Sequence, residues 1–175
     1  MAALPAAPFA YPIVDASRLR GRDPAFVVDS LARAGARLIQ LRAKGLSDRP
    51  WLAMARAALA AARASGAPLV VNDRADIARI VGADGLHVGQ DDLTGTDARA
   101  VVGPGVLLGL STHNLDQLAA AATEAVDYVA IGGITRANAR SVVEAGADGL
   151  AVISDLLDAP DLARAFTELA AAIRG

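Results

Sequence analysis

Amide and basic side chains alternate with apolar residues in one short segment of the sequence. Gln40, Arg42 and Lys44 lie two positions apart, which starts them on one face if the segment is a β-strand. A guanidinium and a flexible ammonium beside an amide suit an anionic ligand, most simply a phosphate group. Arg42 and Lys44 could equally be ordinary solvated loop charges, and their spacing leaves both interpretations open.

Acidic residues follow the next two apolar segments. Asn72 and Asp73 close one of them, and Asp91 and Asp92 follow the other. Carboxylates at neighbouring strand ends can share Mg²⁺, which typically takes one or two carboxylates with phosphate oxygens and water. The competing interpretation is that Asp73 and Asp92 cap the helices that follow, which is the commoner fate of an aspartate after a strand.

Further polar positions close the later segments. Gly132 and Gly133 precede a helical segment, and Ser154 follows the last apolar run at Ile153. Glycines let backbone N–H groups approach an anion closely, and helix N-termini supply further donors. The glycine pair is weak support on its own, and its place in the order of segments strengthens the prediction of a phosphate site.

The sequence has two histidines, and neither is predicted to be a catalytic base. His87 lies inside an apolar segment, which indicates a hydrogen-bonded core imidazole. His113 comes two positions after Ser111, but no nucleophile elbow surrounds this serine. We therefore expect Ser111 to contact a ligand rather than to act as a nucleophile.

Most of these polar positions close segments typical of strands buried on both faces, because the segments are short and rich in Val, Ile and Leu. They span 11–15, 37–42, 68–73, 85–90, 106–112, 127–133 and 149–154. Segments with helical spacing or strong helix formers lie between them, at 24–34, 51–64, 97–102, 115–125, 137–145 and 160–173. Glycines that suit helix C-caps precede four of the strands, at Gly35, Gly66, Gly82 and Gly146.

Alternating strands and helices predict a parallel sheet with right-handed crossovers. An open doubly wound sheet normally carries a glycine-rich loop after its first strand, and Asp15-Ala16-Ser17 is not such a loop. A site assembled from many strand ends is typical of a (β/α) barrel. We therefore expect one TIM-barrel-like α/β domain over residues 1–175.

Composition narrows the classes of function. The net charge of −2 and an aromatic content of 3% argue against nucleic-acid binding. The chain has no cysteine, which excludes disulfides, thiol catalysis and cysteine-bound zinc. No segment predicts a membrane span or a signal peptide, so we expect a cytoplasmic protein without membrane contacts.

The motifs taken together resemble the thiamine-phosphate synthase family, whose thiazole tautomerase relatives share the fold. The resemblance covers nearly the whole chain in order and spacing, and it is carried by residues 40–44, 72–74, 85–92, 109–113, 127–128, 130–134 and 151–154. It implies a transferase that joins hydroxymethylpyrimidine diphosphate to thiazole phosphate and gives thiamine phosphate and pyrophosphate.

The resemblance also implies roles for individual residues. Arg42 and Lys44 would neutralise the departing pyrophosphate, and Asp73 and Asp92 would bind Mg²⁺. Ser111 would contact the pyrimidine. The pyrimidine diphosphate would be held by Asn72 and by the segment 40–44, which consists of Gln40, Leu41, Arg42, Ala43 and Lys44. The thiazole phosphate would be held by Gly133, Ile153 and Ser154.

One departure from the family pattern is large. In the family, the strand that matches Asp127-Tyr128 ends in a loop with a Thr-x-Thr-Lys motif, and a helix and a strand follow before the Gly-Gly motif. Here Ala130 runs directly into Ile131-Gly132-Gly133. About one βα unit is missing, which leaves seven strands where the barrel needs an even number for its layers of inward side chains.

Seven strands predict a distorted or incomplete barrel with a gap around residues 127–133. Another subunit could cover the exposed edges, which would make a homo-oligomer. The alternative function is an impaired or non-catalytic relative that binds thiamine precursors, or a thiazole tautomerase-like protein. The pyrimidine-diphosphate half of the expected site is intact, so we expect Mg²⁺-dependent binding of that substrate to survive better than coupling.

Overall fold

The computed structural model describes residues 3–131 and 134–173, in which parallel strands alternate with helices. The strands are β1 (Phe9–Asp15), β2 (Ile39–Arg42), β3 (Leu69–Asn72), β4 (Gly85–Val88), β5 (Leu107–Thr112), β6 (Tyr128–Ile131) and β7 (Gly149–Val152). The helices are α1 (Pro24–Arg33), α2 (Asp48–Ala64), α3 (Ala75–Val81), α4 (Gly95–Val102), α5 (Leu115–Ala121), α6 (Ala139–Glu144), α7 (Ser154–Leu157) and α8 (Leu162–Ala172), with a 3₁₀ turn at Ala16–Arg18. Helix α3 lies between Asp73 and Gly82, where the capping alternative places a helix, whereas α7 lies outside the expected helical segments.

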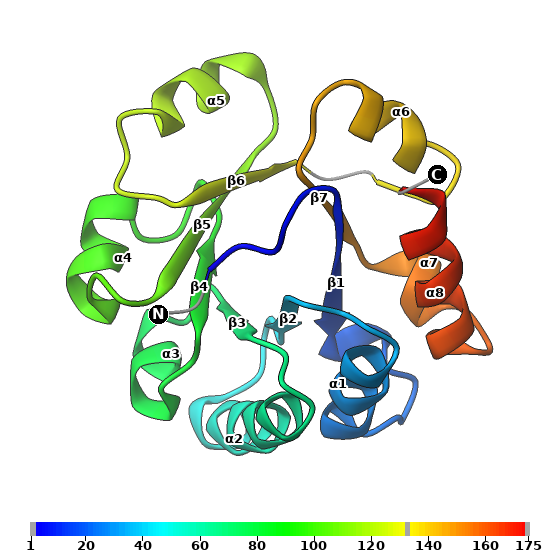
Figure 1. Ribbon diagram of the computed structural model, residues 1–175. Coiled ribbons are helices and arrows are strands. Elements are labelled where there is room, and N and C mark those ends of the chain that lie inside the picture. The colour runs from blue at the N-terminus through cyan, green and yellow to red at the C-terminus, as the bar shows by residue number, and fades with distance from the viewer. Residues whose placement is uncertain (1–2, 132–133, 174–175) are drawn as a thin grey trace.

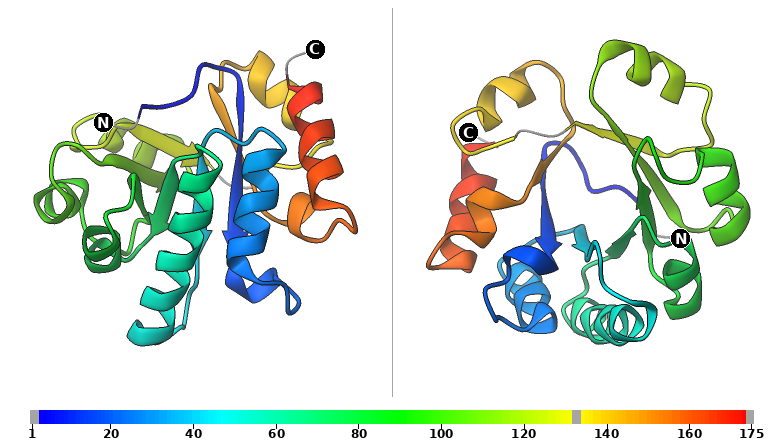
Figure 2. Two further views of the ribbon diagram at one scale, coloured as in Figure 1. Left: turned by 60° about the horizontal axis from the view of Figure 1, so that its bottom comes forward. Right: turned by 180° about the vertical axis from the view of Figure 1, so that it is seen from behind.

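The strands form one parallel sheet that curls into a barrel and stops short of closure. Their order is β6-β5-β4-β3-β2-β1-β7, and the helices cover the outer face (Figures 1 and 2). In the described part of the chain, β6 pairs with β5 and β7 with β1, and no ladder joins β6 to β7. The predicted seven-stranded, incomplete barrel is therefore confirmed, and its open seam lies at the missing βα unit.

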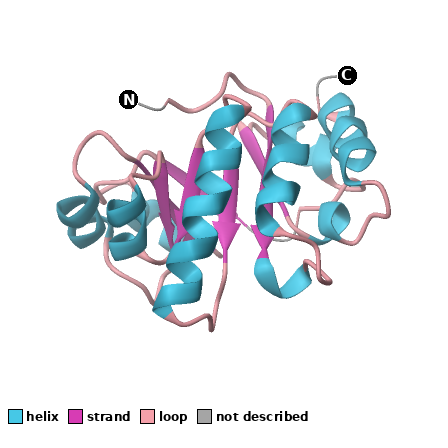
Figure 3. Cartoon of the chain, turned by 90° about the horizontal axis from the view of Figure 1, so that it is seen from below, coloured by secondary structure: helices cyan, strands magenta, loops and turns pink. Residues whose placement is uncertain are grey.

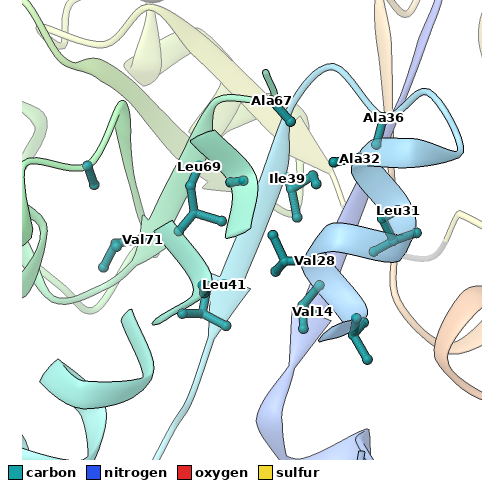
Figure 4. Packing of buried hydrophobic residues seen from close by; sticks show 14 of the residues in the cluster. Val14, Val28, Leu31, Ala32, Ala36, Ile39, Leu41, Ala67, Leu69 and Val71 are labelled. Carbon is teal, nitrogen blue, oxygen red and sulfur yellow. The ribbon is translucent and has the colours of Figure 1, made fainter. Parts of the chain in front are cut away.

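The larger hydrophobic core lies between the sheet and the helices. Ile39 and Leu41 of β2 belong to this core together with Val28 and Leu31 of α1, and Figure 4 shows their side chains in the space between the sheet and the helices. The helices pack along the outside of the strands on all sides seen in Figure 3. Because the inward residues are also buried, strands such as β3 are covered on both faces, which explains their continuous apolar sequence.

The barrel interior changes character along the strands. Near the amino ends, Tyr11, Leu38, Val70 and Leu107 form a second apolar cluster, against which Tyr128 packs. Towards the carboxyl ends the inward positions are polar, and they include Asp15, Gln40, Arg42, Asn72, His87 and Ser111. The apolar layer thus closes the interior below a polar site at the strand ends.

Gly109 on β5 is an inward position without a side chain, and two rings occupy the space beside it. A Cβ atom there would lie 2.2 Å from Cζ of Tyr128 and 2.4 Å from Nδ1 of His87. We expect Gly109→Ala to lower the free energy of unfolding by about 1–3 kcal/mol, because both rings must move. Urea unfolding measures this change, and an unaltered midpoint would contradict it.

No helix in the part of the chain that the structure describes is long and apolar enough to cross a membrane.

Candidate active site at the carboxyl ends of the strands

A cavity of about 500 Å³ opens inside the barrel at the carboxyl ends of the strands. Six residues expected in the site line it together, namely Gln40, Arg42, Asn72, Ser111, Ile153 and Ser154. The side chain of Leu41 instead packs in the core between the sheet and the helices, and Gly133 lies outside the described residues. The strand β7 ends at Val152, so that Ser154 begins α7 rather than closing the strand.

Asp15 holds Arg42 at the edge of this cavity, a contact that the sequence analysis missed. One oxygen of the buried Asp15 carboxylate accepts a hydrogen bond from Arg42, and the other accepts from the backbone and hydroxyl of Ser17 at 2.9 and 2.7 Å. Burial acts to raise the pKa of Asp15, but these hydrogen bonds outweigh it and lower the pKa below its usual value. The ionised carboxylate therefore orients the guanidinium beside the space a ligand would fill. In the sequence, Tyr11, Ile13 and Asp15 occupy alternate positions of one strand, and this spacing could have indicated that Asp15 faces the barrel interior.

The two aspartates proposed for Mg²⁺ come together beside a lysine. Burial and the neighbouring carboxylate of Asp92 raise the pKa of Asp73, and Lys44 partly opposes this effect from 3.4 Å. The Asp73 N–H donates to the carbonyl of His87 at 2.7 Å, which ties the end of β3 to β4. The backbone N–H of Gly89 donates to Asp92 at 2.8 Å. Two neighbouring carboxylates repel each other when both are ionised, so binding of a cation beside them is favourable.

Neither aspartate caps a helix, so the competing interpretation is wrong. Arg74 occupies the N-cap of α3. Thr94 caps α4 by accepting a hydrogen bond from the backbone of Asp97. Neither carboxylate is therefore taken up by the first turn of the helix that follows it.

A second cavity of about 230 Å³ adjoins the Asp73 carboxylate. Ala43, Lys44 and Asp73 line it, and Asn72 lines both this cavity and the larger one. The described residues contain no group of three or more side chains arranged to hold a metal ion. The donor set fits Mg²⁺, which commonly keeps water and takes substrate phosphate oxygens beside one or two carboxylates.

A chain of hydrogen bonds crosses the interior below the larger cavity. His87 contacts the Ser111 hydroxyl through Nε2 at 2.9 Å and the Tyr128 hydroxyl through Nδ1 at 3.2 Å. The Tyr128 hydroxyl lies 2.9 Å from the Tyr11 hydroxyl. The Tyr11 hydroxyl oxygen in turn accepts a hydrogen bond from the Gln40 amide nitrogen at 3.0 Å. Burial lowers the pKa of His87 to about 4, although Asp92 opposes the shift. The predicted hydrogen-bonded core histidine is confirmed, whereas the two tyrosines were not singled out.

The fold and these strand-end contacts define an α/β-barrel protein whose polar site lies where barrel enzymes carry theirs. The family pattern described as thiamine monophosphate synthase matches residues 10–130. That match covers well over half of the sequence, and the chain belongs to the thiamine monophosphate synthase family.

Individual relatives agree with this assignment. The thiamine-phosphate synthase of Roseiflexus castenholzii is 37% identical over 199 residues, with 92% of this chain and 87% of the relative covered. That of Acidothermus cellulolyticus is 39% identical over 197 residues and covers 92% of each chain. The thiamine phosphate pyrophosphorylase structure from Pyrococcus furiosus is similar, with a TM-score of 0.86 at 27% identity and coverage of 94% and 95%.

These alignments also bear on the missing unit. They extend over 199 and 197 residues, which is more than the 175 residues of this chain. The relatives therefore carry residues that have no counterpart here. The family match ends at residue 130, which is where the sequence analysis places the loss and where the seam opens.

Proposed function

We propose that this chain joins hydroxymethylpyrimidine diphosphate to thiazole phosphate and releases thiamine phosphate and pyrophosphate. Membership of the family supports this activity. The observation that carries the proposal is the pairing of Asp73 with Asp92 beside Lys44, next to a cavity lined by Arg42 and Asn72. Carboxylates and cations side by side suit a diphosphate together with a divalent ion.

The proposed reaction needs positioning and charge neutralisation more than proton transfer. The bond between the pyrimidine methylene carbon and the diphosphate oxygen breaks, and both electrons leave with pyrophosphate. The lone pair of the thiazole nitrogen then forms the new carbon–nitrogen bond with the pyrimidine cation. No general base is needed at that nitrogen, so the protein contributes by aligning the partners and stabilising the leaving group.

The site residues divide between the two substrates in this proposal. Gln40, Arg42, Lys44 and Asn72, with the backbone of Leu41 and Ala43, hold the pyrimidine diphosphate, and Ser111 contacts the pyrimidine. Asp73 and Asp92 would hold Mg²⁺, which when bound neutralises negative charge on the diphosphate. Ile153, Ser154 and Gly133 would hold the thiazole phosphate. Arg18, which pairs with Asp158 at 3.0 Å, also lines the larger cavity and would contribute a further guanidinium beside a second phosphate.

The test is a product assay on the purified full chain with both substrates and Mg²⁺. We expect thiamine phosphate to form only when all three are present, and chelation of the metal to stop it. Calorimetric titration with pyrimidine diphosphate, with and without Mg²⁺, accompanies the assay. Metal-dependent binding without product would overturn the synthase in favour of a non-catalytic binder, and absence of binding would reject both.

A further inference from the structure

The hydrogen-bond chain below the larger cavity has a direction, because each member has few donors and acceptors. The Gln40 amide nitrogen donates to the Tyr11 hydroxyl oxygen. Tyr11 is 3% exposed, and among the described residues Tyr128 is the remaining partner of its hydroxyl. A buried O–H without an acceptor is costly, so Tyr11 donates its hydrogen to Tyr128.

The donors and acceptors of the next two residues, Tyr128 and His87, can be assigned in the same way. The Tyr128 hydroxyl accepts from Tyr11 and donates to Nδ1 of His87. A neutral imidazole carries one hydrogen, so His87 holds it on Nε2 and donates it to the Ser111 hydroxyl oxygen. Burial raises the pKa of Tyr128 well above its usual value, which keeps this donor protonated.

Ser111 stands at the end of the chain and lines the larger cavity. Because its oxygen accepts from His87, its own hydrogen is left to point at a ligand. We propose that Tyr128 is a positioning residue that fixes His87 with its hydrogen on Nε2 and thereby makes Ser111 a hydrogen-bond donor. The ligand group placed against Ser111 must then be an acceptor, such as an unprotonated ring nitrogen or a phosphate oxygen, and not an N–H group.

The packing supports a fixed geometry for this arrangement. The rings of His87 and Tyr128 lie 5.5 Å apart between centroids, and those of Tyr11 and Tyr128 lie 6.0 Å apart in an edge-on contact. The missing side chain of Gly109 leaves the space in which the first pair meets. The hydroxyl of Tyr128 is therefore held against His87 by contacts from both sides.

The first test measures the tautomer in the ligand-free full chain by ¹⁵N NMR of the histidines at neutral pH. We expect the hydrogen of His87 on Nε2 in the native chain. Tyr128→Phe removes the donor to Nδ1, so the ¹⁵N resonance of this unprotonated nitrogen should move towards that of an imidazole nitrogen without a hydrogen bond. Tyr11→Phe is the matched control, because it removes one hydroxyl from the same chain and leaves Tyr128 on His87. A native His87 with its hydrogen on Nδ1, or no change in Tyr128→Phe, would overturn the proposal.

The second test asks whether Tyr128 acts through Ser111, and it rests on the proposed function because it uses pyrimidine diphosphate as the probe. We expect Tyr128→Phe and Ser111→Ala each to weaken binding by roughly fivefold to tenfold, as the loss of one hydrogen bond would. In the Ser111→Ala background, Tyr128→Phe should cost no further affinity. Additive losses would contradict the positioning role. If the native chain binds no pyrimidine diphosphate, the proposed function fails, while the tautomer measurement still decides this inference.

Discussion

Replacing Asp73 with asparagine is expected to lower kcat/KM for thiamine phosphate formation by about a hundredfold or more, equivalent to about 3 kcal/mol. The change removes the carboxylate that Asp92 and Lys44 flank, and with it much of the affinity for Mg²⁺. The backbone of Asp73 has a φ of 62°, which asparagine adopts with little cost. The fold should therefore survive, and the loss should be confined to the site.

Steady-state kinetics across a Mg²⁺ titration measures this effect and separates it from misfolding. The activity of Asp73→Asn and Asp92→Asn should require a higher Mg²⁺ concentration than that of the native chain. Asp91→Asn is the matched control, since Asp91 is an exposed aspartate next to Asp92, whereas it is the Asp92 carboxylate that meets Asp73 and accepts a hydrogen bond from the N–H of Gly89. Native Mg²⁺ dependence in both site variants would rule out the proposed metal site.

The parallel barrel could be predicted from the sequence because the same pattern, an apolar strand followed by a helix, recurs along the chain. Strands covered by helices outside and by packed side chains inside are apolar throughout, and the glycines expected to end helices have left-handed backbones, as at Gly35 and Gly146. Boundaries were less predictable. The strand expected over 85–90 ends at Val88, because Gly89 turns its N–H towards Asp92 instead of a neighbouring strand.

The side-chain contacts inside the barrel could not be predicted from single segments of the sequence. Tyr11 and Tyr128 are 117 positions apart, and their meeting depends on how far the barrel curls before the seam. Asp15 could be placed on an inward face by alternation, but its pairing with Arg42 depends on the register that sets the two residues opposite each other. Residue types indicate which chemistry is available, whereas sheet register decides which groups meet.

The pH dependence of stability is the second large effect, and it comes from His87. Burial lowers the pKa of this imidazole from 6.5 to about 4 in the folded chain. Between these values the unfolded chain binds a proton that the folded chain does not, so the free energy of unfolding rises with pH. The contribution is complete above the unfolded pKa and is lost as pH falls through the folded value. Moving from pH 7 to pH 4 should therefore cost about 3 kcal/mol through this residue.

Urea unfolding of the native chain and of His87→Asn at several pH values between 4 and 7 isolates this contribution. The variant starts less stable at pH 7, because Tyr128 and Ser111 lose a partner, yet its stability should fall much less on acidification. Carboxylates such as Asp15 titrate in both proteins, so their effect cancels in the difference. His113→Asn, which removes an exposed imidazole, controls for the loss of a histidine as such. Parallel stability curves for the native chain and His87→Asn would show that His87 ionises freely in the folded protein, and an imidazolium there could not accept a hydrogen bond from Tyr128.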